Sequence, residues 1–145
     1  MNIIDNFLPL EIFNEFTKHA ISSPHFVGVS HTAYTTEAYN NNFAEQQMQA
    51  IMFQRYINSC EVSDCYLHLE PQIKRIHELL QIKRLWLMRL NCTFGQKERY
   101  QGAWHIDNSW SKYLQEHGKT CILYLNSNNG GTQFKDGPFV KSEAN

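Results

Sequence analysis

The sequence has no apolar run that approaches the roughly 18 consecutive residues of a transmembrane helix. Its N-terminus also lacks the basic region followed by an apolar region that is typical of a secretory signal. The formal net charge is −1, so no excess of Lys and Arg favours binding to nucleic acid or to an anionic membrane. These absences predict a soluble cytoplasmic protein that has neither of these partners.

Cysteine is scarce and follows no known pattern. The four cysteines, Cys60, Cys65, Cys92 and Cys121, form no C-x-x-C pair and none of the zinc-binding spacings. Cys92 and Cys121 lie in apolar runs that are typical of strands. We therefore expect these two thiols to be reduced and to pack as small apolar groups.

The composition is that of an ordinary globular domain. The 145 residues are 42% hydrophobic and 19% charged, which predicts one domain with one core. Apolar residues at helical spacing predict helices at 9–22, 44–57 and 71–82, the second from Met48, Ile51, Met52 and Tyr56. Looser alternation predicts a strand at 25–34. Residues 1–82 would then form a helix-rich supporting part and residues 83–145 a β-core.

Residues 84–94 form the clearest strand of the β-core. Alternation places Arg89 and Asn91 on one face, and Met88, Leu90 and Cys92 on the other. If the first face looks into the mouth of a barrel, Arg89 or Asn91 could bind an anionic ligand. If it looks outward, both side chains are simply solvated.

His105 and Asp107 are candidate metal ligands. In an extended strand, residues i and i+2 point to the same face with their Cα atoms roughly 6.5 Å apart, so one ion can bind both. An imidazole nitrogen and a carboxylate oxygen are two of the three ligands of the facial triad that holds Fe(II) in oxygenases. A His and an Asp with this spacing are common by chance, so the metal site has to be judged from the residues around them.

The context is a hydrophobic segment, Thr120 to Asn126, followed by Asn128-Asn129-Gly130-Gly131. With His105-Ile106-Asp107-Asn108, these segments resemble the metal strand, the next core strand and the hairpin of 2-oxoglutarate/Fe(II) oxygenases of the prolyl 4-hydroxylase type. Ile4 to Pro9 is similar to the way such domains begin. The resemblance spans the chain and is most specific over residues 100–134. It implies a mainly β (α+β) fold, the double-stranded β-helix jelly roll, with N-terminal helices packed on one sheet.

The resemblance also implies a function. His105 and Asp107 would bind Fe(II), and the enzyme would use 2-oxoglutarate and the co-substrate O2, with ascorbate as an optional addition. It would hydroxylate a C–H bond and release succinate and CO2. The substrate would be a peptide side chain or a small metabolite. Tyr124 would donate its hydroxyl to a carboxylate of 2-oxoglutarate, and Arg89 and Asn91 are further candidates for cofactor binding.

The family pattern needs a second histidine and a basic residue after the hairpin. The sole histidine after Asp107 is His117, which we expect in a loop at 112–119 rather than at the metal. Residues 139–145 resemble the segment that leads into the next strand, so the last strands of the jelly roll are expected to be missing. The turn at 128–131 is expected to use positive φ angles for a tight reversal.

Two other functions stay open. The chain could be a truncated, non-catalytic domain whose open sheet edge pairs with a partner chain or with a second copy. It could also be an incomplete gene product without a stable fold, in which case thermal unfolding would show little cooperativity.

Overall fold

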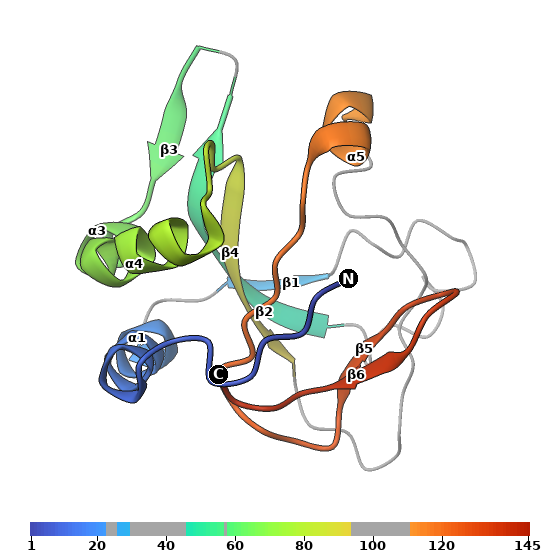
Figure 1. The fold of residues 1–145 in the computed structure, drawn as a ribbon. Helices are drawn as coiled ribbons and strands as arrows, with labels where there is room; N and C mark the ends of the chain where they lie inside the picture. The colour runs from blue at the N-terminus through green and yellow to red at the C-terminus, as the bar shows by residue number, and fades with distance from the viewer. Residues whose placement is uncertain (23–25, 30–45, 57, 94–110) are drawn as a thin grey trace. The chain divides into compact units, whose positions relative to one another are not determined.

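The computed structural model describes residues 1–22, 26–29, 46–56, 58–93 and 111–145 (Figure 1). The chain divides into two compact units, Met1–Val29 with Gln46–Gly95, and Ser30–Glu45 with Gln96–Asn145. The predicted metal strand with His105 and Asp107, the loop before it and residues 30–34 of the first predicted strand lie outside the described residues.

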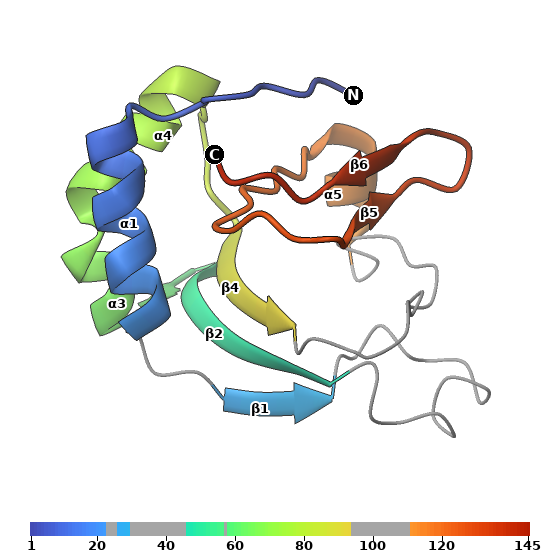
Figure 2. The same cartoon turned by 90° about the horizontal axis from the view of Figure 1, so that it is seen from below.

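The described part of the first unit contains a four-stranded antiparallel sheet and three helices. Its elements are α1 (Leu10–Ser22), β1 (Phe26–Val29), β2 (Gln46–Arg55), β3 (Cys60–Val62), α3 (Asp64–His68), α4 (Glu70–Leu80) and β4 (Leu87–Thr93). Strand β4 pairs along most of one edge of β2, so β1 and β3 pair with the two ends of its other edge. The helices gather on one side of this sheet (Figures 1 and 2).

Helix α1 confirms the prediction for residues 9–22. Its buried side chains, Phe13, Phe16 and Ala20, recur at the spacing of one helical face. The first turn is closed by a hydrogen bond of 2.9 Å from the Phe13 amide to the carbonyl of Pro9. The core of this unit continues from Phe16 to Leu8, Met52, Leu69 and Ile73, which are all almost fully buried.

Helix α4 confirms the prediction for residues 71–82, and the short helix α3 before it is an addition. Ser63 begins α3 by accepting a hydrogen bond of 3.2 Å from the Tyr66 amide on its hydroxyl oxygen. Pro71 stands in the first turn of α4, where its missing N–H costs nothing. Gln81 ends the helix in the left-handed conformation, with φ of 52°.

The helix predicted for residues 44–57 is wrong, because residues 46–55 form β2, the central strand of the sheet. Opposite β4, Ile51 pairs with Arg89 and Phe53 pairs with Met88, so Met52 is an extra residue in a β-bulge. Met52 and its neighbour Phe53 are both buried, whereas Ile51 is 51% exposed. The bulge interrupts the alternation of β2, and the interrupted pattern has the spacing of a helix.

Strand β4 confirms the strand predicted within residues 84–94, and β1 confirms the earlier one over residues 26–29. Leu90 is buried, while Arg89 and Asn91 are exposed, as expected if their face looks outward. Cys92 is exposed near the end of β4, and Cys121 is also exposed. The prediction that these two thiols pack in the core is therefore wrong.

The second unit contains α5 (Lys112–His117) and a two-stranded antiparallel sheet of β5 (Gly131–Gln133) and β6 (Phe139–Lys141). Helix α5 replaces the loop predicted for residues 112–119. The Ser111 hydroxyl accepts a hydrogen bond of 3.3 Å from the Leu114 amide, and the Leu114 side chain is buried. The helix ends at Gly118, where a Cβ atom would collide with the carbonyl oxygen of Leu114.

The strand predicted for residues 120–126 is also wrong. Within residues 111–145 this segment pairs with no strand, and its Ile122 side chain is 54% exposed. Its main-chain contacts are single hydrogen bonds, such as the one of 3.1 Å from the Asn145 amide to the Tyr124 carbonyl. Apolar alternation alone does not make a strand, because a strand also needs a partner for its hydrogen-bonding groups.

The reversal predicted at residues 128–131 lies further along the chain. Strands β5 and β6 are joined through Phe134 to Pro138, and none of residues 128–131 has a positive φ angle. Gly131 serves a different purpose, because a Cβ atom there would collide with the carbonyl oxygen of Val140 and lie 2.9 Å from the Lys141 Cα atom. The glycine allows β6 to approach closely.

The fold is therefore of the α+β class with antiparallel sheets, and the described residues form no barrel. No helix in the described ranges is both long and apolar enough to cross a membrane. The single domain expected for residues 1–145, with a division near residue 82, stays a prediction.

Candidate functional site

Three of the five predicted site residues, Tyr124, Asn91 and Arg89, belong to the described part of the chain. The two predicted metal ligands, His105 and Asp107, lie outside it. Within the residues that the structure describes, no group of three or more His, Cys, Asp or Glu side chains is placed so that it could hold a metal ion.

Tyr124 is half-buried and its hydroxyl group is held in place. The hydroxyl oxygen lies 2.6 Å from Oγ1 of Thr132 on β5, and either atom could be the donor. A phenol can donate one hydrogen bond and accept others at the same time. Tyr124 can therefore accept from Thr132 and donate its own proton to a further acceptor, which is what a role in binding a carboxylate requires.

Arg89 and Asn91 are exposed on β4 of the first unit. Their Cα partners on the central strand are Ile51 and Gln49. Tyr124 belongs to the other unit. A shared ligand for these residues stays a prediction.

His117 occupies the last turn of α5, not a loop. Its ring lies 4.8 Å from the ring of Tyr113, and its Nε2 atom lies 3.9 Å from a carboxylate oxygen of Glu116. The side chain is 60% exposed. These contacts give His117 local partners on its own helix.

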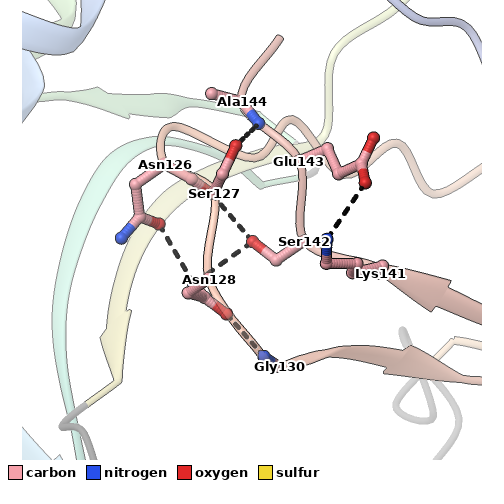
Figure 3. Close-up of polar contacts among 8 residues, drawn as sticks. All are labelled: Asn126, Ser127, Asn128, Gly130, Lys141, Ser142, Glu143 and Ala144. Atoms are coloured by element: carbon pink, nitrogen blue, oxygen red, sulfur yellow. Dashed lines mark hydrogen bonds and ion pairs between the residues drawn. The ribbon is translucent and has the colours of Figure 1, made fainter.

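A cluster of polar residues that the sequence interpretation missed lies directly after Tyr124. We call it the hairpin cluster, and it consists of Asn126, Ser127, Asn128, Gly130, Ser142 and Ala144 (Figure 3). Ser142 is almost fully buried, and its hydroxyl donates a hydrogen bond of 2.9 Å to the Asn126 carbonyl. The Asn128 side-chain amide donates to the Ser142 hydroxyl at 3.3 Å.

Further contacts of the hairpin cluster involve main-chain amides. The Ala144 amide donates to the Ser127 hydroxyl at 2.9 Å, and the Gly130 amide donates to Oδ1 of Asn128 at 2.7 Å. A sequence signal was present, because Asn and Ser side chains next to one another commonly bind neighbouring backbone groups. The cluster fixes the segment between Tyr124 and β5 against the end of β6.

In the first unit, the imidazole of His77 lies in an unusual environment. The Nε2 atom of His77 on α4 is buried and has no hydrogen-bond partner among the described residues. Burial penalises the charged imidazole, and it lowers the pKa of His77 from its ordinary value. Among the described residues, burial is the sole cause of this shift, so His77 favours its neutral form.

No protein-family model, curated protein or solved structure matches this chain. A functional interpretation must therefore come from its own residues.

Proposed function

We propose that this chain carries part of the active site of an Fe(II)- and 2-oxoglutarate-dependent dioxygenase that resembles prolyl 4-hydroxylases. The observation that carries the proposal is the pair His105 and Asp107, followed at the family's spacing by Tyr124 and by Gly130-Gly131. The α+β class and the antiparallel sheets are compatible with the N-terminal helices and jelly-roll strands of that family.

The roles of the residues follow from their chemistry. An imidazole and a carboxylate suit Fe(II), so His105 and Asp107 would be two of its ligands. Bound iron would supply the oxidation chemistry, in which 2-oxoglutarate is converted to succinate and CO2. Tyr124 would hold one carboxylate of 2-oxoglutarate through its hydroxyl, which Thr132 orients at 2.6 Å.

The third ligand of the iron is proposed to be a histidine, and two sources of it are considered. It is either His117 or a group that does not belong to residues 1–145. His117 would have to give up its contact with the Tyr113 ring to reach a metal ion. We favour a group from elsewhere, with a peptide side chain or a small metabolite as substrate and the cytoplasm as location.

The first experiment is anaerobic. Fe(II) and then 2-oxoglutarate are added to the purified chain, and the visible charge-transfer band of a chelated keto acid is recorded. If the third ligand comes from this chain or from its oligomer, the band should appear with the unchanged chain and be lost with Asp107→Ala. Asp136→Ala is the matched control, because Asp136 is an exposed carboxylate in the turn between β5 and β6, and it should leave the band intact.

Three outcomes separate the possibilities. A band that survives Asp107→Ala would contradict the proposed ligand set. A band that also requires His117 would assign the third ligand to this chain. The absence of a band from the folded chain would contradict a complete site within residues 1–145.

A second function, a non-catalytic interaction domain, is favoured by one observation. In the described part of the first unit, β4 pairs only with β2, so its other edge has no partner strand there. An edge strand of this kind can pair with another chain. Size-exclusion chromatography with light scattering tests this function, and a monodisperse monomer at all concentrations would contradict pairing with a second copy.

A further inference from the structure

The hairpin cluster contains a pair of residues with a reactivity of its own. Asn129-Gly130 is the only Asn-Gly pair in the 145 residues. Asn followed by Gly is the dipeptide in which the next backbone nitrogen most easily attacks the asparagine side chain, because glycine has no side chain to hinder the approach. Both residues are exposed to solvent.

The reaction is deamidation through a succinimide. The Gly130 amide loses its proton to a base in the solvent, its nitrogen forms a bond to Cγ of Asn129, and the bond from Cγ to the side-chain nitrogen breaks. That nitrogen takes up a proton and leaves as ammonia. Water then opens the cyclic imide at one of its two carbonyl carbons, which leaves aspartate or isoaspartate. Water is the sole co-reactant, and nothing is oxidised or reduced.

The attacking nitrogen is not free in the folded chain. The Gly130 amide donates a hydrogen bond of 2.7 Å to Oδ1 of Asn128 (Figure 3). The same Asn128 side chain is anchored through its Nδ2 atom, at 3.3 Å from Asn126 Oδ1 and at 3.3 Å from Ser142 Oγ. The proton that must leave Gly130 is thus bound by a neighbour that is itself held in place.

We propose that Asn129-Gly130 is a site of spontaneous deamidation, and that Asn128 slows the reaction in the folded chain by binding the Gly130 amide. Breaking this hydrogen bond must precede removal of the proton. A hydrogen bond of about 1 kcal/mol corresponds to a factor of about five in rate. Asn128→Ala should therefore deamidate at Asn129 about fivefold faster than the unchanged chain.

The modification would have a structural consequence. An isoaspartate adds a carbon atom to the main chain, and either product places a carboxylate before β5. Two residues after Asn129 stands Gly131, which already lies too close to β6 to accept a Cβ atom. We expect the modified chain to pair β5 with β6 less tightly. The fraction of chains modified at Asn129 would increase with the age of the protein.

The test follows the folded proteins over time in mildly alkaline buffer and measures modification of Asn129 by peptide mapping and mass spectrometry. Asn128→Asp keeps an oxygen that can accept from Gly130, and it should stay as slow as the unchanged chain. Ser142→Ala is the matched control. It removes the side-chain contacts of Ser142 but leaves the Asn128–Gly130 hydrogen bond, the contact of Asn128 with Asn126 and the main-chain bonds of Ser142, so it should also stay slow.

A parallel incubation in concentrated urea removes the folded structure. There the unchanged chain and Asn128→Ala should react at the same rate. The proposal is overturned if folded Asn128→Ala is no faster, if Ser142→Ala or Asn128→Asp is as fast as Asn128→Ala, or if the difference persists in urea. If Asn128→Ala does not fold, hydrogen exchange at the Gly130 amide of the unchanged chain tests the proposal instead. The amide should be protected from exchange, and an unprotected amide would overturn the proposal.

Discussion

The hydroxyl oxygens of Tyr124 and Thr132 lie 2.6 Å apart, and this contact joins the predicted cofactor-binding tyrosine to β5. It gives the phenol a fixed neighbour in a segment that otherwise has few regular main-chain hydrogen bonds. Whatever Tyr124 binds, its orientation depends on Thr132.

The contact between Tyr124 and Thr132 can be measured by a double-mutant cycle. We expect Tyr124→Phe, Thr132→Val and the double variant to give a coupling energy of about 1 kcal/mol in the free energy of unfolding, the net value of a typical hydrogen bond. Urea unfolding followed by circular dichroism provides the values. Additive effects of the two substitutions would show that the contact contributes nothing to stability.

Turnover tests the proposed metal ligands. His105→Ala and Asp107→Ala should each abolish succinate production by any active form, because each removes a ligand of the iron. Asp136→Ala should retain the activity of the unchanged protein, since Asp136 lies exposed in a turn. Succinate release from either ligand variant at the unchanged rate would refute the assignment.

Metal binding should weaken in acid. An unperturbed imidazole titrates near ~6.5, and a metal ion binds only its neutral form. Binding of Fe(II), followed by calorimetry under argon, should therefore fall as the pH decreases from neutral to clearly acidic values. Unchanged affinity over this range would argue against a histidine ligand.

His77 should make the folded state less stable in acid. Burial lowers its pKa in the folded state, so the unfolded chain binds the proton more readily. The contribution of His77 to stability is therefore fully present above the unfolded pKa, near ~6.5, and is lost as the pH falls from there toward the lower folded pKa. Carboxylates also titrate in acid, so the test compares two proteins.

The comparison uses His77→Leu, which keeps a side chain of similar bulk without a titratable group. Urea unfolding of both proteins at a series of pH values gives the free energy of unfolding. The unchanged chain should lose more stability than the variant as the pH falls below ~6.5. Parallel curves for the two proteins would contradict an effect of His77.

Core substitutions test the bulge in β2. Met52 is completely buried, so Met52→Ala should lower the free energy of unfolding by about 2–5 kcal/mol. Ile51→Ala should change it by about 0.5 kcal/mol or less, because the Ile51 side chain is half exposed. Similar losses for both variants, measured by urea unfolding, would argue against the bulge.

The sequence predicted the elements whose apolar pattern is uninterrupted. Helix α1 buries one face at regular spacing, so periodicity was enough to find it. The apolar pattern also found α4, although Ile73 is the only apolar side chain that this helix buries fully. The alternation likewise separated the exposed Arg89 and Asn91 from the buried Leu90, but it placed the exposed Cys92 on the wrong side. Each of these signals is local and needs no knowledge of the rest of the chain.

The wrong predictions have physical causes. The extra residue Met52 shifts the pattern of β2 into a helical spacing, and only the pairing with β4 reveals it. Helix α5 is short and depends on its cap at Ser111, which apolar periodicity does not detect. Residues 120–126 alternate as a strand does but find no partner within the described part of their unit. Strand pairing thus decided the first and third of these cases, and a local cap decided the second.

For the candidate site, chemistry was more informative than periodicity. The choice of His105, Asp107 and Tyr124 came from residue types and spacing, and the orientation of Tyr124 by Thr132 could not be foreseen from them. The hairpin cluster was missed because its partners are distant in sequence. Ser142 bonds to Asn126 across 16 positions.

The pairing of β2 with β4 sets the order in which the first unit can assemble. These strands enclose β3, α3 and α4 in the sequence, so their contact closes a long loop that carries both helices. Closing such a loop costs entropy before the helices gain buried surface, and folding should be limited by this step. Leu90→Ala should then slow refolding in stopped-flow experiments, and an effect on the unfolding rate alone would contradict this order. A nascent chain would hold its helices without the complete four-stranded sheet to pack on until Leu87–Thr93 has been synthesised.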